Sequence, residues 1–77
     1  MPDPSDDIDT QVLSDINSRT LVDGAGIEPG LITNALHVAP ALLHDSLMRL
    51  QRRGHVRLEP GGLVGITADG HRALSAN

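Results

Sequence analysis

The sequence predicts a small, mainly α domain with one β-hairpin, in the order α-α-α-β-β-α. Apolar residues recur at helical spacing up to residue 53. Two prolines stand at the starts of short apolar segments, as they do at the first positions of helices. Beyond Gly54 the apolar residues alternate at the shorter period that is typical of strands. A chain of 77 residues has room for one such domain.

The first part of the chain predicts a tail followed by a helix. Residues 1–5 combine two prolines with small polar residues, which predicts a flexible acidic tail ahead of a single domain over residues 6–77. A helix is expected over about residues 7–19, with room to extend through Leu21 and Val22. Its apolar stripe consists of Ile8, Val12, Leu13 and Ile16. The helix dipole favours negative charge at its start, so the expected role of the nearby acids is capping: Asp6, Asp7 and Asp9.

Prolines mark the starts of the next two helices, because the missing N–H costs no hydrogen bond at the first helical position. The second helix is expected to begin at Pro29 and to close with residues 37–39. Its apolar stripe consists of Leu31, Ile32, Ala35 and Leu36. The third helix begins at Pro40, and Gly54 follows as its C-terminal cap. One face of this helix is expected to be buried against the first two: Leu43, Leu47 and Leu50.

Two short strands and a last helix complete the predicted domain. The apolar residues of the strands are Val56 and Leu58, followed by Leu63, Val64 and Ile66. Residues 59–62, Glu-Pro-Gly-Gly, are expected to form a compact turn between the strands. Thr67 is expected to cap a helix over about residues 68–75. Gly70 has two interpretations, a close approach to neighbouring backbone or an ordinary loop glycine.

Two segments carry a resemblance to a known family. Residues 31–56, LITNALHVAPALLHDSLMRLQRRGHV, resemble a short helix, a small-residue turn and a helix ending in Leu-x-x-Leu-x-x-x-Gly-x-Val. Residues 65–74, GITADGHRAL, are similar to a closing strand and the start of a helix. The chain in this way resembles the winged helix-turn-helix family of small transcription regulators, including MarR-like, PadR-like and archaeal phage-repressor-like domains. The resemblance implies a DNA-binding regulator whose third helix lies in the major groove.

The resemblance also implies which residues would meet DNA. The outward face of the third helix should carry Ala41, Leu42, His44, Asp45, Met48, Arg49 and Arg52. Ala41 and Leu42 suit a thymine methyl group. His44 suits guanine as a donor, and Asp45 suits the amino group of cytosine as an acceptor. Phosphate contacts are expected from four arginines: Arg49, Arg52, Arg53 and Arg57. Double-stranded DNA is therefore the expected partner, with no cofactor.

Other interpretations of these residues stay open. The arginines can instead pair with an acidic tail that competes with DNA, pair with Glu59, or remain solvated. The leading positions of the third helix suit base reading poorly, and the turn at residues 59–62 offers no cation to the minor groove. Ala41, Leu42 and Met48 also suit a protein contact. The alternative function is accordingly a protein-interaction or dimerisation module.

Charge is distributed unevenly along the chain. Seven acidic residues against Arg19 give −6 over residues 1–30, and five arginines against three acids give +2 over residues 31–77, for a net charge of −4. Such asymmetry favours either an anionic partner for the second part or shielding of that part by the first.

Composition excludes several function classes. With no aromatic residue the chain has no stacking platform for single-stranded nucleic acid, and with no cysteine it has no thiolate metal site. The four histidines lack metal-ligand spacing and no nucleophile motif is present, so neither a metal nor an enzymatic activity is expected. The acidic start and the absence of a long apolar run predict a cytoplasmic protein without a membrane span.

Overall fold

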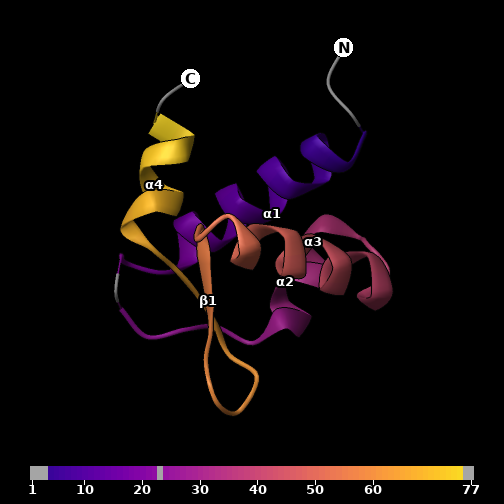
Figure 1. The fold of residues 1–77 in the computed structure, drawn as a ribbon. Coiled ribbons are helices and arrows are strands. Elements are labelled where there is room, and N and C mark those ends of the chain that lie inside the picture. Colours follow the sequence, from indigo (N-terminus) through magenta and orange to yellow (C-terminus); the bar gives the residue numbers. More distant parts are fainter. Residues whose placement is uncertain (1–3, 23, 76–77) are drawn as a thin grey trace.

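The fold is known from a computed structural model that describes residues 4–22 and 24–75. These residues form α1 (Pro4–Arg19), α2 (Pro29–Leu36), α3 (Pro40–Arg52), β1 (Val56–Leu58), β2 (Val64–Ile66) and α4 (Ala68–Ser75). The predicted order of elements is therefore confirmed over this part of the chain. Figure 1 shows the β1–β2 hairpin projecting away from α1 and α4.

α1 begins earlier than predicted and ends at Arg19, as predicted. The helix starts at Pro4, because a proline in the first turn costs no hydrogen bond. Ser5 is helical as well, and residues 1–3 of the expected tail lie outside the described residues. The helix does not use the possible extension through Leu21 and Val22, and Leu21 is 81 % exposed.

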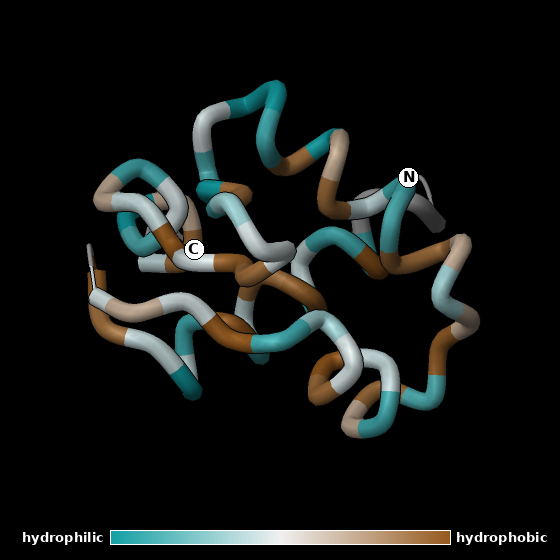
Figure 2. The backbone as a smooth tube through the Cα atoms, turned by 90° about the horizontal axis from the view of Figure 1, so that it is seen from below, coloured by the Kyte–Doolittle hydropathy of each residue, from teal (hydrophilic) through white to brown (hydrophobic). Residues whose placement is uncertain are grey.

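An aliphatic core joins all three N-terminal helices to the hairpin. The buried apolar residues are Val12, Leu13 and Ile16 of α1, Ile32 of α2, Leu43, Leu47 and Leu50 of α3, and Val56, Val64 and Ile66 of the hairpin. The predicted leucine face of α3 is thereby confirmed. In Figure 2 hydrophobic segments of several elements meet near the middle of the molecule. Burial of these side chains removes apolar surface from water and is the main stabilising term available to a small domain.

α2 ends sooner than predicted, ahead of the turn to α3. α2 ends at Leu36, and His37 takes a left-handed conformation with φ 54°. Ala39 is extended, with ψ 144°, because Pro40 disfavours a helical residue before it. Residues 37–39 therefore form the turn itself and do not close α2 as predicted.

The C-terminal end of α3 is capped as predicted. Gly54 has φ 78°, a conformation that residues with a side chain seldom adopt. Its N–H donates to the carbonyl oxygen of Gln51, and the N–H of His55 donates to that of Leu50, both at 2.9 Å. This pair of bonds is a Schellman motif, and it turns the chain directly into β1.

The hairpin carries a third short partner that was not predicted. β1 and β2 pair antiparallel, with Val56 opposite Ile66. Ile27, in the segment between α1 and α2, exchanges two backbone hydrogen bonds with Val64 at 2.8 and 2.9 Å. The segment ahead of α2 is thus fixed against the sheet.

α4 starts at the predicted cap and packs tightly on the end of α3. The Thr67 hydroxyl accepts from the N–H of Gly70 at 3.0 Å and donates to the carbonyl oxygen of Gly54 at 2.6 Å. A side chain on Gly70 would overlap the carbonyl oxygen of His55. The close-approach interpretation of Gly70 is therefore confirmed.

Candidate nucleic-acid interface on the third helix

The N-terminal half of α3 presents an open face to solvent. Pro40 fixes the start of the helix, and the leucines on the other face hold it against the core. The exposed residues of this half are Ala41, Leu42, His44 and Asp45, as predicted. Leu42 is 50 % exposed, so this face of α3 includes a large apolar side chain. Met48, further along, is half-buried.

A shallow cavity of about 280 Å³ lies next to this face. It is formed where the first turns of α2 and α3 meet, and its lining consists of Pro29, Gly30, Thr33, Pro40, Leu43, His44 and Leu47. The lining is mostly apolar, with polar groups from Thr33 and His44. The start of α3 therefore combines an exposed apolar side chain, a carboxylate and a hollow.

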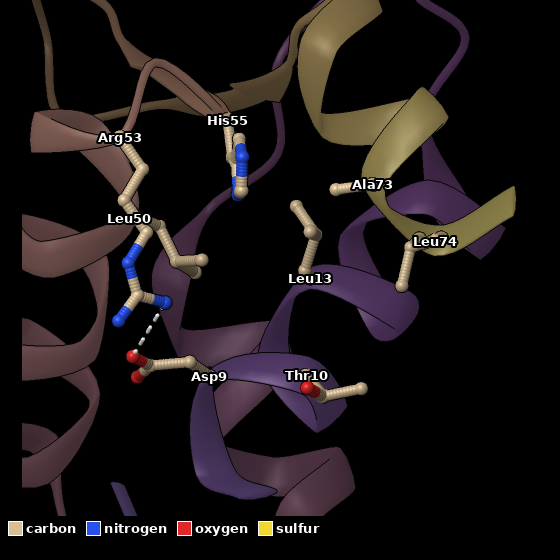
Figure 3. Close-up of a pocket in the computed structure, with 8 residues that line it drawn as sticks. All are labelled: Asp9, Thr10, Leu13, Leu50, Arg53, His55, Ala73 and Leu74. Atoms are coloured by element: carbon tan, nitrogen blue, oxygen red, sulfur yellow. Dashed lines mark hydrogen bonds and ion pairs between the residues drawn. The ribbon is translucent and has the colours of Figure 1, made fainter. Parts of the chain in front are cut away.

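The C-terminal half of α3 is held by a carboxylate from α1. Asp9 is only 2 % exposed, and its Oδ1 accepts from the Ser46 hydroxyl at 2.6 Å. Arg49 donates from Nε to Oδ2 at 3.0 Å and from Nη2 to Oδ1 at 2.9 Å. Arg53 donates from Nη1 to Oδ2 at 3.4 Å. We refer to these four residues as the Asp9 clasp, and Figure 3 shows Arg53 reaching from α3 to Asp9 on α1.

The Asp9 carboxylate is stabilised in its charged form. Burial alone raises the pKa of Asp9, but hydrogen bonds from Arg49 and Ser46 and the charges of both arginines outweigh burial. Together they lower the pKa of Asp9 from its ordinary value of 3.8. The clasp is therefore fully ionised at neutral pH.

The clasp corrects two expectations. Asp9 does not cap α1, because the helix begins at Pro4 and the carboxylate reaches across to α3. Arg49 and Arg53 were expected on phosphates, but their guanidinium groups lie on Asp9 with side chains 33 % and 46 % exposed. Among the described residues, the partner of both arginines is Asp9 within α1 rather than an acid of the expected tail.

The remaining two arginines differ from each other. Arg57 donates from Nη2 to the carbonyl oxygen of Gly24 at 2.9 Å and to Glu59 Oε1 at 3.1 Å. Its guanidinium lies over Gly65, where a side chain would collide with it. Arg52 is exposed, and among the described residues no carboxylate pairs with it. Of the four expected phosphate contacts, Arg52 is the one that no carboxylate of the described residues engages.

Sequence reasoning missed Ser46 and the role of Asp9, although a signal was present. Asp9 precedes Val12 by three positions and Leu13 by four, which places it on the apolar stripe of α1. Ser46 follows Leu43 by three positions and precedes Leu50 by four, so it lies on the buried face of α3. Two complementary polar residues, each on an apolar face, indicate a buried contact between the two helices.

Residues of other chemistry are dispersed. No group of three or more potential metal ligands gathers anywhere in residues 4–22 and 24–75. His71 is engaged separately, with Nδ1 at 3.0 Å from Asn17 Oδ1. Among the described helices, none is both long and apolar enough to cross a membrane.

Comparison of the chain with protein-family models, with curated proteins and with solved structures gave no match. The geometry of α3 and its surroundings is accordingly the basis for assigning a function.

Proposed function

We propose that the chain is a winged helix-turn-helix domain that binds double-stranded DNA in transcription control, in the cytoplasm and without a cofactor. The observation that carries the proposal is the presentation of α3. Its leucine face is buried, its N-terminal half is open, and it follows α2 after a three-residue turn. A helix held in this way, with a hairpin beside it, can enter a major groove.

The charges of the site set the expected strength of binding. Arg52 is the arginine most able to reach a phosphate, because Arg49 and Arg53 lie on Asp9 and Arg57 lies on Glu59. Asp45 on the leading face repels the DNA backbone. The proposal therefore predicts weak binding. The logarithm of the binding constant should fall with the logarithm of the salt concentration with a slope of about one to two. Four arginine–phosphate contacts would give a slope of roughly four.

The test is fluorescence anisotropy of a labelled duplex pool titrated with the protein at several low salt concentrations. Arg52→Ala should lower the affinity at all sequences and reduce the salt slope by about one. Arg72→Ala is the matched control, because it removes an equal charge from α4, where Arg72 pairs with Asp69.

Equal effects of the two substitutions would show that only net charge matters and that α3 does not contact the DNA. Absence of any binding at roughly 50 mM salt would remove the proposal altogether.

A second candidate function is supported by a different observation. Leu42 is half exposed in the N-terminal half of α3, and Asp45, three positions later, is exposed as well. An exposed apolar side chain on a helix face favours a protein contact, in particular a contact with a second copy of the chain. In this candidate the same face of α3 serves as a dimerisation surface.

A further inference from the structure

Three side chains of α3 converge on a single anion. Ser46, Arg49 and Arg53 follow one another at intervals of three and four residues, so they project from one face of the helix. Their hydroxyl and guanidinium donors meet the two carboxylate oxygens of Asp9 at 2.6 to 3.4 Å. Arg49 binds both oxygens, in the fork geometry that arginine offers equally to carboxylates and to phosphates.

An external anion cannot share this place with Asp9. The carboxylate is 2 % exposed, so a phosphate that drew Arg49 and Arg53 away would leave a buried charge with neither of its cationic partners. Loss of one partner of a buried ion pair is strongly unfavourable. Asp9 also belongs to the same chain and therefore competes without an entropic cost of association.

We propose that Asp9 is a built-in competitor, which occupies an anion site on α3 and withholds Arg49 and Arg53 from the phosphates of an approaching nucleic acid. That the excluded anion is a nucleic-acid phosphate rests on the proposed function, whereas the existence of the anion site does not. Removal of the carboxylate would expose the site and give α3 two further cationic groups.

The surroundings provide a route into the vacated site. A cavity of about 90 Å³ lies beside Asp9, between α1, the end of α3 and α4. Figure 3 shows Asp9, Arg53 and His55 on one side of it and the apolar residues Leu13 and Leu74 on another. A small anion in this cavity would lie next to Arg53 and to the place that the Asp9 carboxylate leaves when it is absent.

The first experiment measures duplex affinity and its salt slope for Asp9→Asn and for Asp7→Asn. Asp7 is exposed on the same helix, so its substitution removes the same charge without changing the clasp. Asp9→Asn should bind DNA at least fivefold more tightly than Asp7→Asn, with a salt slope steeper by about two. A folded Asp9→Asn variant that binds like Asp7→Asn overturns the proposal.

The second experiment needs no DNA. Asp9→Ala removes one carboxylate, and free formate has the size and charge of the missing group. Millimolar formate, at constant ionic strength made up with chloride, should raise the melting temperature of Asp9→Ala but not that of Asp7→Ala, as followed by circular dichroism. If Asp9→Ala is unfolded without formate, recovery of its helical signal is the expected result.

The two experiments test the anion site and the proposed DNA binding separately. No selective effect of formate overturns the anion site, whatever the DNA result. An effect of formate together with no DNA binding by any variant upholds the site and removes the proposed function instead.

Discussion

Asp9 shows how a single polar side chain fixes the position of a whole helix. The leucines of α3 hold it to the core through contacts that have no directional preference. The clasp adds direction, because Ser46, Arg49 and Arg53 each bind Asp9 at a set distance. The carboxylate therefore adds a directional constraint on the rotation of α3 about its axis, beside the buried leucine face.

The ionisation of Asp9 should appear in the pH dependence of stability. Its pKa is lowered in the folded state, so its contribution is complete above the unfolded value near 3.8 and is lost as the pH falls through the folded pKa. We expect Asp9→Asn to lower the free energy of unfolding at neutral pH by about 2 kcal/mol, since the arginines that lose their partner are still partly solvated.

The difference between Asp9→Asn and the wild-type protein should shrink as the pH falls below about 4. Urea unfolding followed by circular dichroism at a series of pH values measures it. A constant difference at every pH would show that the charge of Asp9 does not contribute, and Asp7→Asn provides the control for loss of one surface charge.

At the scale of elements, the start of α4 lies very close to the backbone that follows α3. Gly70 is buried in α4 against the backbone of His55. We expect Gly70→Ala to lower the free energy of unfolding by about 3 kcal/mol, because the added methyl group meets backbone that cannot move aside easily.

Gly30→Ala is the matched control for Gly70→Ala. Gly30 also lies in a helix, but a side chain there would meet nothing within 4 Å. The substitution should raise the free energy of unfolding by about 0.5 to 1 kcal/mol, because alanine favours helix more than glycine does. Similar losses at both positions, measured by urea unfolding, would contradict the close packing of Gly70.

Element boundaries could be predicted wherever the signal acts within a few residues. Pro29 and Pro40 start helices, Gly54 ends one and Thr67 caps one, all as expected. The end of α2 was predicted wrongly because it depends on the left-handed conformation of His37, which no pattern of apolar residues indicates.

Long-range partners were not predicted. Ile27 pairs with β2, and Ser46 binds Asp9 across 37 positions of the chain. Such contacts depend on how the helices pack against one another. The sequence therefore did not indicate that Arg49 and Arg53 pair with Asp9 on another helix.

For the whole molecule, the fold partly cancels the charge asymmetry of the sequence. The acidic first part and the basic second part meet where α1 packs along α3, and Asp9 takes two of the arginines there. Arg57 is neutralised within the hairpin by Glu59. Among the described residues of α3, this pairing leaves Arg52 as the arginine without a carboxylate partner. DNA binding would use that charge, whereas a dimer would use the apolar side chain of Leu42.

The dimerisation candidate predicts that the chain self-associates through the start of α3. Sedimentation velocity up to about 1 mM protein, where weak dimers become populated, measures this. Leu42→Asp should abolish association and leave the fold intact, because Leu42 is 50 % exposed and its charge would be buried in the dimer. Leu21→Asp, at an 81 % exposed position outside α3, should leave association unchanged. A protein that is monomeric throughout, or that responds equally to both substitutions, removes self-association through α3 as a candidate function.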